Sequence, residues 1–198
     1  MNRLQEKYQK EVLPRMKAEF GYKNDLAVPR LLKATVNSGV GRFKDEKTVE
    51  EIAADLTRIV GQKAVFTRAK KAIASFKTRQ GQIVGIKVTL RGGRMYDFLD
   101  RLISLSLPRT RDFRGISASA IDSNGNLNLG IKEQIIFPEI SHENVKTIFG
   151  LEVCVSTSAK NQQESQALFK LLGFPISAEK HGKETKKKDK NKDKDKRQ

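Results

Sequence analysis

Residues 83–91 read Ile83-Val84-Gly85-Ile86-Lys87-Val88-Thr89-Leu90-Arg91. Apolar and polar side chains alternate through the second half of this run. The alternation predicts a strand with one buried and one solvated face, because successive side chains of a strand point to opposite sides. The same alternation predicts another strand around Leu32, Ala34 and Val36, whose side chains form its apolar side. Residues 64–69 are a further strand candidate. These three segments predict a half-buried sheet.

Helical spacing appears in other parts of the chain. Residues 3–20 place an apolar side chain at every fourth position, and Pro14 is expected to bend this helix. Thr48 and Glu51 form a capping box, which predicts the start of a second helix. Apolar side chains at helical spacing continue this second helix to residue 60. The same spacing predicts further helices at residues 95–105 and 162–172.

Shorter strands are predicted at residues 116–121, 127–131 and 151–157. Helices interleave with strands, yet one connection is typical of a hairpin and others are short. This pattern favours an α+β fold, with a largely antiparallel sheet and helices packed on one face.

The composition of the chain changes near Ala178. Residues 1–178 are predicted to form one domain, whereas residues 179–198 alternate Lys with Asp and contain nothing that could seed a core. We expect this basic tail to be disordered. Lys180–Gln198 contributes +6 to a net charge of +16, so the remaining residues contribute +10. The excess favours a polyanionic partner, with an anionic membrane surface as the competing one.

The sequence contains no constellation of residues for catalysis or metal binding. Cys154 is the single cysteine, and His142 and His181 are the only imidazoles. Gly39-Val40-Gly41 could begin a dinucleotide-binding turn, but Lys44 stands where the third glycine should be. A backbone turn that needs positive φ or close approach is the simpler interpretation. Without a long apolar run or a hydrophobic signal core, we expect a cytosolic protein with no cofactor and no membrane partner.

If the apolar sides of the three main strands pack on helices, their other sides form a polar face. It contains cations, hydroxyls and an amide but no carboxylate: Lys33, Thr35, Asn37, Lys63, Thr67, Lys87, Thr89 and Arg91. Cations neutralise phosphates, whereas Thr and Asn bond a 2′-hydroxyl or a base edge. We therefore favour RNA contact over the alternative of an ordinary solvated sheet face. The lack of mid-strand aromatics favours folded RNA over single strands.

A basic segment at residues 68–82 connects the second and third strands. It contains no acidic residue and these cations: Arg68, Lys70, Lys71, Lys77 and Arg79. Such a loop can reach a second polyanion. A flexible, solvated hairpin is the alternative.

Four runs of sequence, in the same order along about residues 3–176, resemble bacterial large-subunit ribosomal protein five. They are Thr35-Val36-Asn37-Ser38-Gly39-Val40-Gly41, Lys87-Val88-Thr89-Leu90-Arg91-Gly92, Pro108-Arg109-Thr110-Arg111-Asp112-Phe113-Arg114-Gly115 and Glu133-Gln134-Ile135-Ile136-Phe137-Pro138-Glu139-Ile140. The sequence differs from the usual family pattern at two places. Ser38 stands where a larger apolar residue is usual, and the tail is longer than is usual in the family.

The resemblance implies a non-enzymatic constituent of the large ribosomal subunit that binds 5S rRNA in the central protuberance of cytoplasmic ribosomes. It also implies 23S rRNA and neighbouring large-subunit proteins as partners. The positions that the family uses on 5S rRNA fall here at Asn37, Gln62, Thr89 and Arg91, with Lys33 and Thr35 in support.

Two further contacts follow from the same resemblance. The loop Lys77-Thr78-Arg79-Gln80-Gly81 resembles a projection toward transfer RNA in the peptidyl (P) site. The region of Arg109, Arg111 and Arg114 resembles the side that faces a small-subunit head protein across an intersubunit bridge.

From the residues alone, three other functions stay open. They are an unrelated RNA-binding chaperone or regulator, an enzyme acting on RNA, and a peripheral membrane protein. The enzyme would need a carboxylate or histidine cluster that the sequence does not suggest. The membrane protein would need a basic amphipathic helix, whereas the polar side of residues 3–20 mixes Glu6, Glu11 and Glu19 with its cations.

Overall fold

The computed structural model describes residues 2–43, 45–111, 113–140 and 145–177. The tail predicted at residues 179–198 lies outside these ranges, as do His142 and His181. Within them the chain forms an α+β fold, as predicted. Its strands are β1 (Leu31–Gly39), β2 (Val65–Arg68), β3 (Ile83–Leu90), β4 (Leu127–Ile131) and β5 (Leu151–Thr157).

The five strands form one sheet in the order β2-β3-β1-β5-β4, and every neighbouring pair is antiparallel. The longest strand, β1, lies in the middle, between β3 and β5. The predicted antiparallel sheet is therefore confirmed, and two of the three shorter strand candidates complete it.

One face of the sheet is buried. Val36 of β1 pairs with Val88 of β3 and with Val153 of β5, and Val153 pairs in turn with Leu129 of β4. All four side chains belong to a single hydrophobic core. The alternate side chains are exposed or half-buried, and we call the side of the sheet that they occupy the open face.

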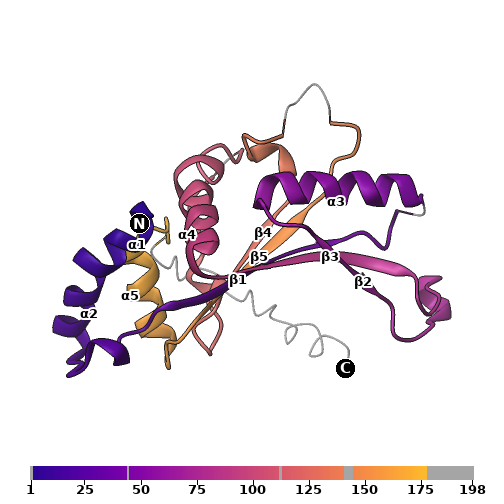
Figure 1. The fold of residues 1–198 in the computed structure, drawn as a ribbon. Helices are drawn as coiled ribbons and strands as arrows, with labels where there is room; N and C mark the ends of the chain where they lie inside the picture. Colours follow the sequence, from indigo (N-terminus) through magenta and orange to yellow (C-terminus); the bar gives the residue numbers. More distant parts are fainter. Residues whose placement is uncertain (1, 44, 112, 141–144, 178–198) are drawn as a thin grey trace, which may run out of the picture.

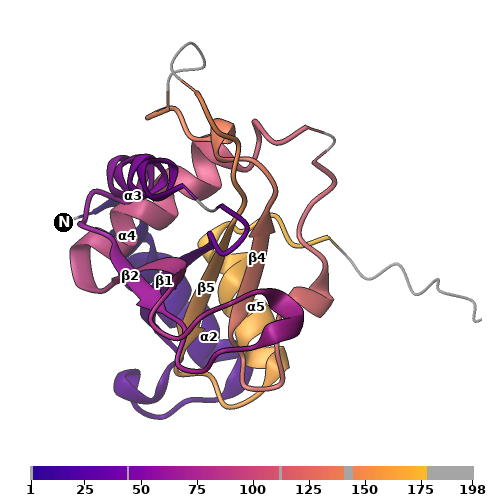
Figure 2. The same ribbon diagram turned by 90° about the vertical axis from the view of Figure 1, so that its right-hand side faces the viewer.

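The helices supply the other half of that core. They are α1 (Arg3–Lys7), α2 (Leu13–Phe20), α3 (Glu46–Val60), α4 (Gly92–Arg101) and α5 (Gln162–Leu172). Figure 1 groups α1, α2 and α5 at one end of the molecule, with α4 between them and α3. In the end-on view of Figure 2, α3 and α4 lie on the same side of the strands. Helices on one face were predicted, and this arrangement confirms it.

The N-terminal helical segment is irregular just before Pro14. A π-helical turn at Tyr8–Val12 joins α1 to α2, and Pro14 lies in the first turn of α2. The helical backbone runs on without a break from the π-helical turn into α2, and Pro14, which has no N–H to donate to the preceding turn, follows directly after this wider turn. The end of α4 widens in the same way, at Leu102–Ser106.

The predicted capping box at the start of α3 is wrong. The helix begins three residues earlier, at Glu46, with Asp45 in place of Thr48 at the N-cap and in an extended conformation. Thr48 lies in the first turn, where its hydroxyl bonds the Asp45 carboxylate at 3.3 Å. Glu51 instead pairs with Lys146. Asp ranks above Thr as an N-cap, so the spacing of Thr48 and Glu51 alone did not decide where the helix begins.

Two strand predictions are also corrected. A β-bulge between Leu31 and Lys33 shifts the register, so Leu31 is buried and Leu32 is 44% exposed. One extra residue in a strand moves later side chains to the other face. Residues 116–121 form no strand, because the chain makes a 3₁₀ turn at Ala118–Ala120 between two isolated bridges.

Of the two reasons predicted for the glycines of the Gly39-Val40-Gly41 turn, positive φ is wrong, and close approach to another molecule stays a prediction. Neither glycine has a positive φ. The amides of Val40 and Gly41 both donate to the carbonyl of Val84, at 3.0 and 3.1 Å. Backbone bonds to β3 therefore fix this turn without a left-handed residue.

Candidate nucleic-acid interface

The centre of the open face brings together four of the predicted RNA-binding side chains. Thr35 pairs with Thr89, and Asn37 pairs with Lys87, across β1 and β3. Asn37 and Lys87 are exposed, and the two threonines are half-buried. Directly paired residues have Cβ atoms about 5 Å apart. The sheet thus fixes an amide, an ammonium and two hydroxyls as near neighbours.

The other predicted side chains of this face surround the centre. Thr67 of β2 pairs with Gly85 of β3. Lys33, Lys63 and Arg91 are exposed at or just beyond strand ends. Arg91 is extended, at the N-cap of α4. The cations other than Lys87 therefore lie toward the ends of the strands, around a more neutral centre.

Gln62 is bonded directly to this face. The helix α3 ends at Gly61, whose φ of 74° is the left-handed conformation that favours glycine. The chain then reverses, and the Gln62 amide Nε2 donates to the carbonyl of Thr89 at 3.2 Å. Only the family resemblance pointed to Gln62, whereas strand alternation pointed to Thr89, and the structure brings the two together.

Two glycines of the open face lie opposite each other in the sheet. Gly39 of β1 lies opposite Gly85 of β3. A Cβ built on Gly85 would lie 2.6 Å from the Thr67 hydroxyl, so a larger side chain would displace its neighbour. The space above Gly85 is thus already filled, and only Gly39, which is exposed and has no atom within 4 Å of a built Cβ, leaves room for another backbone.

Sequence reasoning missed one charged residue on this face. Asn37 pairs with Lys87 on one side and with Glu152 of β5 on the other. Glu152 is exposed, so the acid-free character of the first three strands does not extend across the whole sheet. Its place depends on the register of β5 against β1, which no pattern in the sequence indicated.

Cys154 lies on the same face, opposite Thr35. Its thiol is half-buried, and burial, with a further contribution from the Glu152 charge, raises its pKa. Because the thiolate is the reactive form, a raised pKa argues against a nucleophilic cysteine.

The basic segment between β2 and β3 is a hydrogen-bonded hairpin that projects from the end of the molecule opposite α2 (Figure 1). The Ala69 amide donates to the Gln82 carbonyl at 2.8 Å, and Gly81 donates back to Ala69 at 3.0 Å. Nearer the tip, Ile73 and Thr78 exchange two backbone bonds. The residues predicted to contact transfer RNA, 77–81, lie on the arm of the hairpin that leads into β3. All of them are exposed except Thr78, which is half-buried.

The three predicted bridge arginines, Arg109, Arg111 and Arg114, are exposed in the irregular segment after α4. Arg111 also lines a cavity of about 410 Å³, together with Phe113 and Ile131. The segment that follows β4 is held in place by buried Gln134. Its side chain donates to the Thr147 carbonyl at 2.7 Å and accepts from the Phe149 amide at 2.9 Å.

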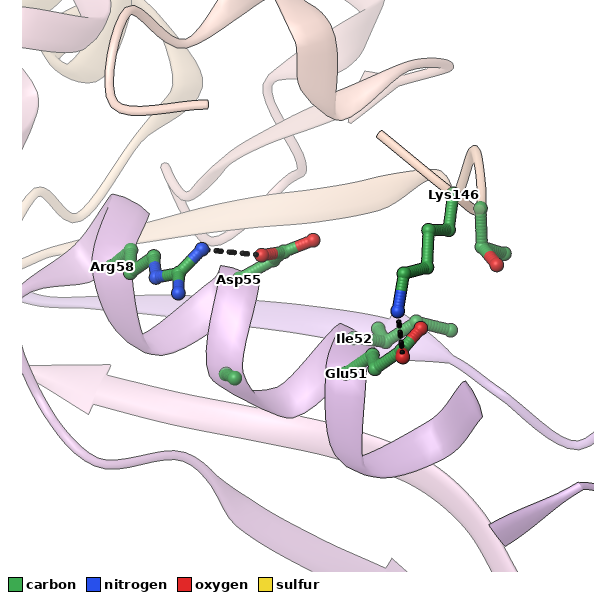
Figure 3. A pocket seen from close by; sticks show the side chains of 7 residues that line it. Glu51, Ile52, Asp55, Arg58 and Lys146 are labelled. Atoms are coloured by element: carbon green, nitrogen blue, oxygen red, sulfur yellow. Dashed lines mark hydrogen bonds and ion pairs between the residues drawn. The ribbon is translucent and has the colours of Figure 1, made fainter. Parts of the chain in front are cut away.

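Charged groups also gather in a pocket of about 190 Å³ beside α3 (Figure 3). Lys146 bonds Glu51 at 2.7 Å, and Arg58 bonds Asp55 at 3.4 Å. Burial raises the pKa of Asp55. The Glu51 charge adds to this effect, so the two carboxylates lie near each other, and each also faces a cation.

Across the described ranges, no group of three or more His, Cys, Asp or Glu side chains is arranged to hold a metal ion. In the same part of the chain, no helix has the length and apolar character needed to cross a membrane.

Two family models match the chain. One is described as ribosomal protein L5 and covers residues 24–79, and the other describes the C-terminus of the same ribosomal family and covers residues 83–176. The chain is also similar to three proteins called large ribosomal subunit protein uL5. That of Chloroflexus aurantiacus is 55% identical over 88% of this chain and 97% of its own length. Those of Clostridium perfringens and a Thermoanaerobacter species are 51% and 50% identical, over 89% of this chain and 99% of their own lengths.

Proposed function

Because the chain belongs to the ribosomal protein L5 family and is a non-enzymatic constituent of the large ribosomal subunit, we propose that its open face binds 5S rRNA. By this contact it helps to attach 5S rRNA in the central protuberance. There the chain would also meet 23S rRNA and neighbouring large-subunit proteins. In the ribosome, the rigid frame of the sheet serves to hold RNA-contacting groups in fixed positions.

The observation that supports this proposal most is the pairing of Asn37 with Lys87 and of Thr35 with Thr89. Lys87 supplies charge for a phosphate, and the amide and hydroxyls supply donors and acceptors for a base edge or a ribose. Gln62 joins this group through its bond to Thr89. Strand pairing sets the positions of these groups before RNA arrives, which lowers the entropy cost of binding.

The polar centre is tested by measuring 5S rRNA affinity for Asn37→Ala and Thr89→Ala. We expect each to weaken binding by about 1–3 kcal/mol, because a specific polar contact is lost. Asn124→Ala removes an exposed asparagine from the turn before β4 and serves as the matched control. Unchanged affinity in both open-face variants would refute 5S binding by this face.

We also propose that the hairpin between β2 and β3 contacts transfer RNA in the P site. Its support is the exposure of Lys77 and Arg79 on a hydrogen-bonded arm that projects from the body. The double variant Lys77→Ala/Arg79→Ala keeps the backbone bonds of the hairpin. It should reduce crosslinks between the protein and P-site transfer RNA and leave 5S affinity unchanged. A loss of 5S affinity would instead assign the hairpin to the 5S contact.

The segment that contains Arg109, Arg111 and Arg114 is proposed to face a small-subunit head protein across an intersubunit bridge. Its support is an exposed cluster of arginines beside an open cavity, a combination that suits an acidic and partly apolar partner. Reversing the charge of Arg109 and Arg111 should weaken the association of purified subunits, most strongly at low salt. Association that is unaffected at every salt concentration would contradict this role.

A further inference from the structure

The tip of the β2–β3 hairpin exposes two large apolar side chains. Phe76 is 77% exposed and Ile73 is 47% exposed. The sequence pattern assigns the function of this loop to the cations around them, and the apolar pair has no role in that interpretation. An aromatic ring left in water at a projecting tip is unfavourable in the free protein, so a partner that covers it would gain from doing so.

The backbone holds Phe76 in one place. It ends the 3₁₀ turn Ala74–Phe76, and the next residue, Lys77, has a left-handed φ of 52°. Across the described residues, Lys77 is the one residue other than glycine with a positive φ. The Thr78 hydroxyl donates to the Phe76 carbonyl at 3.3 Å, and the amide of Lys77 donates to Ala74 at 3.0 Å. Non-glycine residues in this conformation concentrate at binding sites.

The surroundings of the ring specify the chemistry of its partner. Lys70, Lys71, Lys77 and Arg79 are all exposed in the hairpin, and residues 68–82 contain no acid. A partner must therefore present negative charge and a flat apolar surface within a few ångströms of each other. An unpaired nucleotide has both, in its phosphate and its base.

We propose that Phe76 stacks on an unpaired base of the transfer RNA, while Ile73 packs against the same nucleotide and the flanking cations neutralise adjacent phosphates. The proposal rests on the hairpin contact described under Proposed function and adds a residue and a mode of recognition to it. Stacking needs no particular base, because every base has a π face. The contact is therefore compatible with transfer RNAs of different sequence.

The test uses large subunits reconstituted with full-length variants, and it measures the dissociation rate of P-site transfer RNA. Stacking predicts that Phe76→Ala and Phe76→Leu each speed dissociation by about tenfold, within the range for loss of one base–aromatic contact. Phe76→Tyr should dissociate at the unmodified rate, because it keeps the ring. If Phe76→Leu behaves as the unmodified protein does, the contact is merely apolar and stacking is refuted.

The double variant Lys77→Ala/Arg79→Ala separates this inference from the contact on which it rests. If it speeds dissociation and Phe76→Ala does not, the hairpin binds transfer RNA by charge alone and the stacking inference fails. If neither variant changes the rate, the hairpin contact itself fails.

A direct readout uses the absence of tryptophan from the chain. Phe76→Trp introduces a single tryptophan, whose emission can be excited apart from that of the tyrosines, and stacking predicts its quenching when a transfer RNA transcript is added to the isolated protein. Phe66→Trp, on β2 outside the hairpin, is the matched control and should respond less. A Phe76→Trp signal that responds to vesicles of anionic lipid and not to the transcript would overturn the inference in favour of a membrane surface.

Discussion

The open face and the β2–β3 hairpin are both basic and both proposed to bind RNA, yet they are built in opposite ways. On the open face, Asn37 is held between Lys87 and Glu152 by strand pairing on both sides, above a buried core. In the hairpin, no residue from 69 to 82 is buried, and its own backbone bonds hold it together. A surface that is backed by a core suits recognition by groups in fixed positions, whereas an arm held by its own backbone bonds suits contact with a more distant partner.

The largest difference between the two regions should appear in stability. Ile86 lies beneath the open face with no exposed surface, whereas Ile73 at the hairpin tip is 47% exposed. We expect Ile86→Ala to lower the free energy of unfolding by about 2–5 kcal/mol, through lost burial and a residual cavity. Ile73→Ala makes the same chemical deletion and should cost within about 0.5 kcal/mol. Denaturant unfolding of both variants measures this, and equal losses would show that the hairpin is part of the core.

The next difference should appear in the salt dependence of 5S rRNA binding. Lys87 lies at the centre of the open face and Lys77 lies in the hairpin. Removing a cation that contacts a phosphate reduces the slope of log K against log salt by about 1. Lys87→Ala should show this reduction, and Lys77→Ala should leave the slope unchanged. A reduced slope in Lys77→Ala would mean that both regions share one RNA.

The smallest effect should appear at Cys154, which reports on the open face alone. Its raised pKa leaves less thiolate at a given pH, so alkylation should be slower than in the unfolded chain. The rate should also reach its midpoint at a higher pH than for an ordinary thiol. Saturating 5S rRNA should slow alkylation further by covering the face. Alkylation that RNA leaves unchanged would place the 5S contact away from the β1–β5 boundary.

Several features of the fold could be predicted because they depend on local order. Alternation along residues 83–91 predicted β3, and the period of residues 162–172 predicted α5 with the bounds that the structure has. Other features depended on a single inserted or competing residue. The bulge that turns Leu32 outward and the N-cap at Asp45 are of this kind, because several local arrangements fit the same spacing.

The candidate site also contains features that local order predicted and features that it could not predict. Sequence alternation predicted that Thr35, Asn37, Lys87 and Thr89 share a face, and the strand register bears this out. It could not predict that Glu152 lies beside Asn37 or that Gln62 bonds Thr89. These residues are distant in sequence, and the order of strands in a sheet is not encoded in any one strand.

Neighbouring residues were enough to predict the class of fold, the polar side of each main strand and the basic character of the hairpin. The tertiary structure alone decided which strands meet, and so which charges lie side by side. It also decided that Phe76 remains in water, because no other described element covers the hairpin tip. Burial and register are properties of the assembled chain, which is why local patterns could not supply them.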